Sequence, residues 1–175
     1  MLATLATSPK LLLTIGKITS LLAHFWQSHP STLTPSPLVP APAAPVLSQS
    51  VESRVQQLKL SFKLPLVEAL VKQLEKNKAL SASKEEVSPA QAALDLMYVD
   101  LHQIVEQIHE QLTEVKTRRE YHQTKWFASW RTLDCDEPLA KLQELKSQLD
   151  DGFNLLMATW LPLHLSSTLV SSHSN

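Results

Sequence analysis

Glycine is almost absent from this chain, with 2 residues in 175, whereas average proteins use about 7%. Glycine supplies the positive φ angles of tight hairpin turns and lets the backbone approach a phosphate closely. The shortage therefore argues against a hairpin-rich β fold and against a nucleotide-binding loop. It favours a chain built from helices.

Cysteine is nearly absent too, since Cys135 is the single one. One cysteine excludes an internal disulfide and any multi-cysteine zinc site, and it suits a reducing compartment. We therefore predict a cytoplasmic protein, with the nucleus and the mitochondrion as alternatives.

Acidic residues are missing from residues 1–50, which carry only Lys10 and Lys17 as charged side chains. Within residues 1–28, apolar residues recur at helical spacing and predict a short amphipathic helix: Leu11, Ile15, Ile18, Leu22 and Phe25 or Trp26. A targeting segment is the alternative, because the stretch is basic and rich in hydroxyls. From Lys10 to Trp26 it also offers a peripheral membrane contact.

Proline marks the next unit, residues 29–50, which hold six of the eleven prolines. Each proline removes a backbone donor and restricts the residue before it, so we expect a disordered linker. Pro37 to Pro40 spells P-x-x-P, which leaves a ligand for a proline-binding groove as a second interpretation.

Residues 51–165 form the predicted helical domain. Pro65 decides between a strand and a helix in its first part, because proline suits the first turn of a helix. We predict a helix from Pro65 to Lys78, alternatively continuing a kinked helix that starts near Ser50, and then a loop from Ser81 to Val87.

A capping box starts the next helix, with Ser88 as N-cap, Pro89 at the first helical position and Gln91 after it. An apolar stripe follows in steps of three and four: Leu94, Met97, Leu101, Ile104, Ile108, Leu112 and Val115. This pattern predicts one long helix from Ser88 to Arg131. Its length is typical of coiled-coil-like packing.

A last helix is predicted from Pro138 to Trp160, capped by Asp134 or Asp136. Its stripe is Leu139, Leu142, Leu145, Leu149, Phe153, Leu156 and Trp160, and a disordered tail is expected over residues 166–175. The predicted fold is all-α: an antiparallel helical hairpin or three-helix bundle with coiled-coil character, preceded by a disordered proline-rich arm.

Basic and aromatic residues alternate between Lys116 and Arg131. The candidate partner-interface residues are Arg118, Arg119, Tyr121, Trp126, Phe127, Trp130 and Arg131. Aromatic and arginine side chains dominate protein interfaces, although packing of Trp126 and Trp130 in the helical core is the interpretation that we favour. Nucleic-acid binding is a third interpretation, which the near-neutral net charge of −1 disfavours.

Catalytic and metal-binding patterns are weak. His102, Glu106 and His109 share a helix face, but a di-metal bundle needs a second Glu-x-x-His. Cys135 lies among acids that disfavour its thiolate. We therefore predict no enzyme, no cofactor and no metal.

The long apolar stripes lead to the functional prediction. Two stripes alone make a thin core, so a third helix or a partner chain must cover the rest. We predict a non-catalytic scaffold or adaptor subunit that binds other proteins through its helical faces, within an oligomer or hetero-complex. The alternative is a membrane-associated or organelle-targeted helical protein that uses its N-terminal segment.

Overall fold

Five helices make up the regular structure of the residues that the computed structural model describes, which are 8–27, 50–81, 89–124 and 133–172. They are α1 (Ser8–Gln27), α2 (Val51–Gln57), α3 (Leu60–Ser81), α4 (Pro89–Gln123) and α5 (Asp136–Ser172). The predicted all-α class is confirmed. The predicted linker (29–49), the capping serine Ser88 and the second half of the aromatic and basic stretch (125–131) lie outside the described residues.

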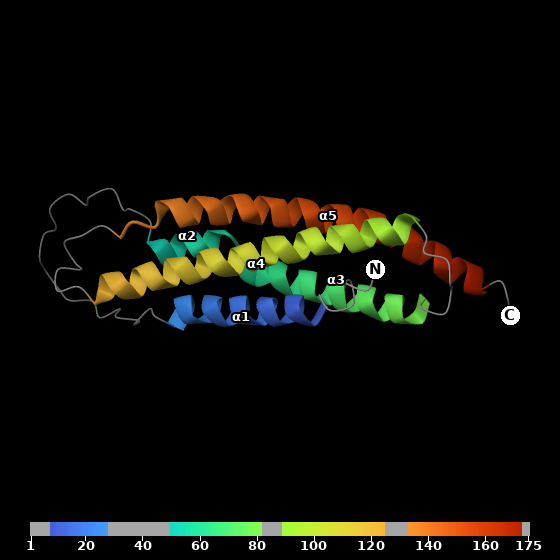
Figure 1. The fold of residues 1–175 in the computed structure, drawn as a ribbon, viewed down its shortest axis with the longest axis horizontal. Coiled ribbons are helices and arrows are strands. Elements are labelled where there is room, and N and C mark those ends of the chain that lie inside the picture. Colours follow the sequence, from blue (N-terminus) through green and yellow to red (C-terminus); the bar gives the residue numbers. More distant parts are fainter. Residues whose placement is uncertain (1–7, 28–49, 82–88, 125–132, 173–175) are drawn as a thin grey trace, which may run out of the picture.

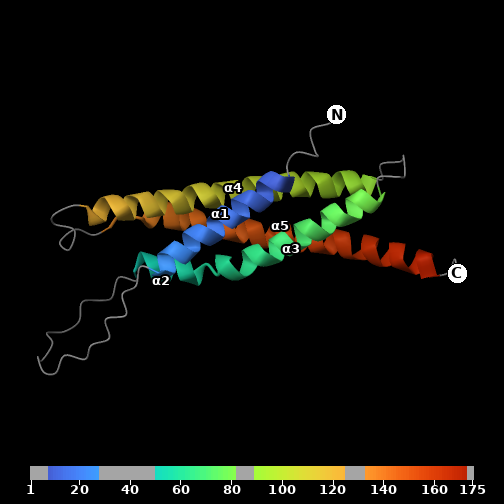
Figure 2. The ribbon, with the colours of Figure 1, turned by 90° about the horizontal axis from the view of Figure 1, so that it is seen from below.

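The four longer helices run alternately up and down the same axis, as Figure 1 shows. α4 packs along α5, and α1 packs on both α4 and α3. Seen from below, α1 crosses obliquely over the surface that α4 and α3 form (Figure 2). The arrangement is thus a four-helix bundle, one helix more than the predicted maximum of three.

The added helix is α1, which we had assigned to a separate N-terminal unit. Its predicted stripe is fully buried: Leu11, Ile15, Ile18, Leu22 and Phe25 are all at most 3% exposed. These side chains belong to the same hydrophobic core as those of α3, α4 and α5. The division between residues 1–28 and residues 51–165 is therefore wrong as a structural boundary, because α1 supplies one wall of the bundle core.

α2 and α3 follow the alternative prediction of an interrupted helix that starts near Ser50, and not the prediction of a helix that starts at Pro65. Ser50 caps α2, where its hydroxyl accepts a hydrogen bond from the Ser53 N–H at 3.2 Å. The chain then breaks at Lys59, whose φ of 52° lies in the left-handed region. α3 starts again at Leu60, so Pro65 lies inside this helix rather than at its first position.

The long helices differ from prediction at their ends. α4 ends at Gln123, short of the predicted Arg131. α5 continues through Pro162 to Ser172, so the predicted tail is helical over 166–172. A proline inside a helix removes one intrahelical hydrogen bond, and the sequence after Pro162 contains no further glycine or proline to end the helix.

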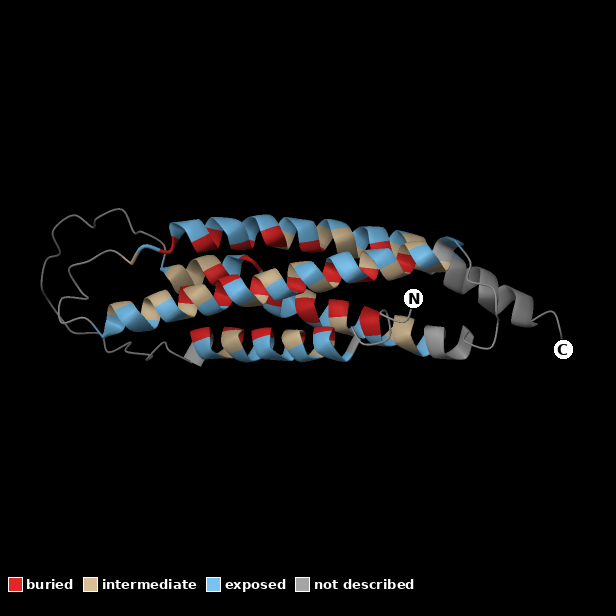
Figure 3. Ribbon diagram, in the orientation of Figure 1, coloured by how far each residue is buried: buried red, intermediate tan, exposed pale blue. Residues whose placement is uncertain are grey.

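The buried residues of α4 and α5 largely match the predicted stripes, but the buried face of α4 is rotated slightly from its predicted stripe. Leu94, Leu101, Ile108, Leu112 and Val115 are buried as expected. Tyr98 and Val105 are buried as well, whereas Met97 and Ile104 are partly buried and pack against the hydrophobic core. The buried strip on α4 is wider than a two-helix seam because α1 and α5 pack on different sides of it. Figure 3 shows buried positions on the inner side of every helix and exposed positions outside.

Candidate interaction surfaces

Arg119, a predicted interface residue, lies at an end of the bundle where three helices meet. Its Nε is 3.1 Å from the Glu52 carboxylate on α2, and the two side chains are only 12% and 15% exposed. Its guanidinium also lies 5.8 Å from the centre of the Phe25 ring on α1. A charge pair this well shielded is costly to break. Arg119 therefore ties α1, α2 and α4 together.

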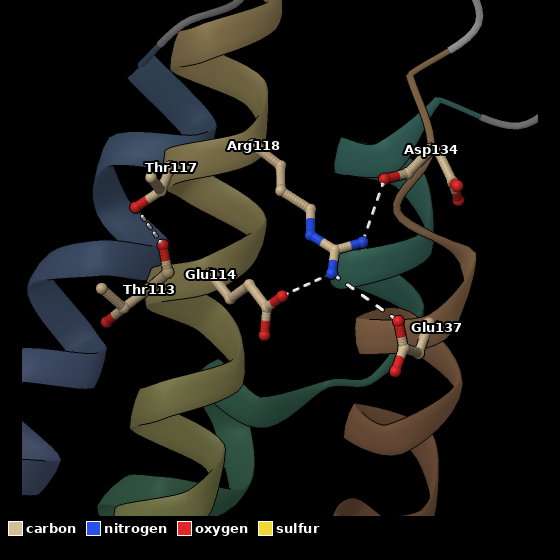
Figure 4. A network of polar contacts seen from close by, with 6 residues as sticks. All are labelled: Thr113, Glu114, Thr117, Arg118, Asp134 and Glu137. Atoms are coloured by element: carbon tan, nitrogen blue, oxygen red, sulfur yellow. Dashed lines mark hydrogen bonds and ion pairs between the residues drawn. The ribbon is translucent and has the colours of Figure 1, made fainter.

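Arg118 makes the corresponding tie between α4 and the start of α5, as Figure 4 shows. Its guanidinium lies 2.5 Å from Glu114 and 3.6 Å from Glu137, and it donates to the Asp134 carbonyl at 3.4 Å. The hydrogen bond with Glu114 raises the pKa of Arg118 further above its already high value, so the group stays charged.

Arg54 and Asp136 form an ion pair that links α2 to the start of α5. This pair and the ties of Arg118 and Arg119 fix the bundle end on which the sequence prediction was centred. Sequence reasoning missed Glu52 and Arg54, because their partners lie on other helices and no local spacing marks them.

Cys135 is buried beside these ion pairs, immediately before α5. Burial raises the pKa of its thiol, the carboxylates of Asp134 and Asp136 raise it further, and Arg118 partly offsets these effects. The expectation that the thiolate is disfavoured is confirmed in direction, with burial as the largest cause. A thiol in this state is a poor nucleophile.

The other predicted interface residues divide into two groups. Tyr121 projects from the last turns of α4 with 64% of its surface exposed. Trp126, Phe127, Trp130 and Arg131 lie outside the described residues. Of the candidates that the structure describes, Tyr121 is thus the one with a largely exposed side chain, and its role at an interface stays a prediction.

Several large apolar side chains are exposed, and Phe62 and Leu66 among them had been part of the apolar pattern at helical spacing in residues 51–77. They are Leu13 on α1, Phe62 and Leu66 on α3, Leu96 and Val99 on α4, and Leu155 and Leu161 on α5. A helix stripe predicts which residues enter the core, and it says little about an apolar residue on the outer face. The most concentrated group is the α3 ridge, which we define as Phe62, Pro65, Leu66 and Ala69, all exposed.

Ligand-binding features are sparse in the described part of the chain. His102 Nε2 lies 3.5 Å from Glu106, and no three histidine, cysteine or carboxylate side chains of the described residues gather closely enough to hold a metal. An open hollow between α2 and α5 is lined by Arg54, Gln57, Leu58, Leu139, Gln143, Lys146 and Ser147. Its mostly polar lining does not suit the apolar pockets that small organic ligands prefer.

None of the helices described here contains an apolar stretch long enough to cross a membrane. The apolar stripe of α1, which consists of Leu11, Ile15, Ile18, Leu22 and Phe25, is buried in the bundle. A membrane contact through this stripe would require α1 to leave the core.

Comparison with known proteins gives one informative similarity. The chain is 29% identical over 84 residues to an uncharacterized protein of Acanthamoeba polyphaga mimivirus, and the match covers 48% of this chain. It spans only 41% of the length of that relative. No protein-family model matches the chain, and no solved structure does.

Proposed function

We propose that this chain is a non-catalytic helical adaptor subunit of the cytoplasm that binds other proteins through the outer faces of its bundle. The observation that supports this most is the α3 ridge. Phe62 is 71% exposed and Leu66 is 41% exposed, one helical turn apart on the same face. Exposed apolar clusters of this kind commonly mark protein interaction sites.

The ridge is presented on a helix that is firmly held. Leu60, Leu64 and Val67 on the opposite side of α3 are at most 1% exposed. Lys63 lies 3.0 Å from Asp150 and 4.2 Å from the Phe153 ring centre on α5. A fixed ridge loses little conformational entropy on binding, and an aromatic residue is a common energetic centre of an interface.

A photo-crosslinking residue placed at Phe62 tests the proposal in cells that express the chain. We expect one dominant crosslinked protein, and we expect it to disappear when Leu66→Glu is added. The matched control carries the crosslinker at Lys76, an exposed position further along α3. Equal crosslinking at both positions, or persistence in the Leu66→Glu variant, contradicts a specific interface at the ridge.

The alternative of membrane association or organelle targeting makes a separate prediction. Lys10 and Lys17 are exposed on α1, so reversing both charges leaves the core intact. If the segment acts as a targeting or lipid-binding element, Lys10→Glu with Lys17→Glu changes the location of the protein in the cell. An unchanged cytoplasmic distribution contradicts the alternative.

A further inference from the structure

The outer faces of α4 and α5 carry exposed apolar and acidic side chains at matching levels. Two contacts set the antiparallel register: a Cβ built on Gly152 lies 3.8 Å from the Leu101 side chain, and Arg118 lies 3.6 Å from Glu137. By this register Leu96 is level with Leu155 to within about a helical turn. Asp100 is level with Asp151 in the same way.

These four side chains form a surface that we call the acidic seam: Leu96, Asp100, Asp151 and Leu155. Leu96 is 65% exposed and Leu155 is 55% exposed, and both aspartates are exposed. Within the described ranges no cation pairs with either aspartate. Two like charges at one level repel each other, and a cation placed between them would relieve the repulsion.

α4 supplies no lysine or arginine that could offset the charge of the seam. Between Pro89 and Val115, α4 has no lysine or arginine. Its acids there are Asp95, Asp100, Glu106, Glu110 and Glu114. A partner for this surface must therefore be a helix with a positive charge and an apolar residue one turn apart.

Such a helix face exists on the same molecule. Lys10, Leu13 and Lys17 recur at three and four residues along α1, so they share one outer face, which we call the basic stripe. Leu13 is 61% exposed, and neither lysine has an ion pair among the residues that the structure places. A Cβ at the neighbouring Gly16 would meet nothing within 4 Å, so space is open there for a second helix.

The two surfaces match each other but cannot meet within one molecule. α1 and α5 lie on opposite sides of the bundle (Figure 1). Leu13 and Lys17 are four residues apart, and so are Leu96 and Asp100 on α4 and Leu155 and Asp151 on α5. Four residues of helix advance about 6 Å, so the apolar and charged positions coincide when the stripe lies in the seam.

We propose that the chain associates with itself, with the basic stripe of one copy docked in the acidic seam of a second copy. Leu13 lies between Leu96 and Leu155, and Lys17 reaches Asp100 and Asp151. The contact is heterologous, because it joins two different surfaces. After two copies associate, one of them still has a free stripe and the other a free seam, so further copies can add until a ring closes, or can continue as a filament. The inference deepens the proposed adaptor function, on which it rests, by assigning one of its partners as the chain itself.

Sedimentation velocity of the full chain across a concentration series tests this proposal. We expect the average mass to rise above the monomer value of 19.6 kDa at low salt. The rise should shrink as salt increases from about 10 mM to about 500 mM, because the Debye length falls from about 30 Å to a few ångströms. A monomer at every concentration and salt overturns the proposal.

Two surface variants make the test specific. Leu13→Glu with Lys17→Glu removes the stripe, and Leu96→Glu with Leu155→Glu removes the seam. Each variant alone should remain monomeric. A mixture of the two keeps one intact stripe and one intact seam, so it should form dimers that grow no further. A mixture that stays monomeric, or variants that associate like the wild type, overturn the docking.

A matched control separates this surface from general charge effects. Phe62→Glu with Lys76→Glu also replaces an exposed apolar residue and an exposed lysine, but on α3. We expect this control to self-associate like the wild type, and loss of its self-association contradicts the assignment. The crosslinking test of the α3 ridge uses the crosslinker at Phe62 and Leu66→Glu as its loss variant, and both changes leave the basic stripe and the acidic seam intact. The two proposals can therefore fail independently.

Discussion

Replacing Ile15 by alanine tests whether α1 is an integral part of the bundle. Ile15 is 1% exposed within the core, whereas Leu13, two residues earlier on the same helix, is 61% exposed. The two positions have nearly the same local helical environment and opposite tertiary environments. Any difference between their alanine variants therefore reports the docking of α1.

The magnitude follows from the burial. Removing three carbon groups from a buried side chain costs about 2.5 kcal/mol at about 0.8 kcal/mol per group. The residual cavity raises the expected loss for Ile15→Ala to about 2–5 kcal/mol. Leu13→Ala deletes exposed atoms and should change the free energy of unfolding by less than about 0.5 kcal/mol.

Urea unfolding followed by circular dichroism measures both variants. With a slope of about 1–3 kcal/mol per molar, the midpoint of Ile15→Ala should fall by about 1 M or more, while that of Leu13→Ala stays near the wild type. These measurements belong at low protein concentration, where self-association does not contribute. Equal midpoints for the two variants would contradict the burial of Ile15, because they would mean that α1 does not pack on the other helices.

Three further predictions concern the ion pair of Arg119 with Glu52, the carboxylate of Asp150, and Gly16. Arg119→Met should lower the free energy of unfolding by about 1–3 kcal/mol, because Glu52 loses its partner at 15% exposure. Adding Glu52→Gln should restore part of the loss, and a double-mutant cycle with no coupling contradicts the tie. Burial alone would raise the pKa of the Asp150 carboxyl, but the hydrogen bonds from Lys146 and Lys63 outweigh this and lower it. A lowered folded-state pKa means that this stabilisation is present above the ordinary value of 3.8 and is lost as the pH falls through the folded-state value. Asp150→Asn should therefore have a lower urea midpoint than the wild type at neutral pH and nearly the same midpoint at the lowest pH where the protein folds; a difference independent of pH is the contrary result. Gly16→Ala should raise the free energy of unfolding by about 0.5–1 kcal/mol, since nothing lies within 4 Å of the new Cβ and the helix gains a better former. A lower thermal midpoint for that variant shows that the position is not open.

The helices themselves were largely predictable from the sequence. The stripe from Leu11 to Phe25 identified α1, and Pro89 marked the start of α4 correctly. Apolar periodicity reports which face of a helix is buried. It does not report what that face packs against, so the proline-rich segment after α1 led us to place that helix outside the domain.

The break at Lys59 shows a second limit. Its positive φ occurs at a lysine, a residue without special preference for that conformation, so no local signal predicts it. Pro65 was a stronger local signal, and it placed the predicted start of α3 five residues too late. Tertiary packing on Leu60 and Leu64, both at most 1% exposed, extends the helix to the N-terminal side of the proline.

The surfaces were the least predictable part. Arg118 and Arg119 were selected for their residue types, but their partners Glu52 and Glu137 become visible only when helices distant in the sequence are brought together. The acidic seam likewise depends on the register of α4 against α5. A pattern within one helix carries no information about the register between two.

Hydrogen exchange of the full chain, followed amide by amide, tests the central claim that α1 closes a four-helix bundle. We expect that amides between Leu11 and Phe25 exchange with protection close to that of the central amides of α4, because both helices share one core. Exchange of the α1 amides at the rate of an unfolded peptide, with α4 and α5 still protected, would contradict it.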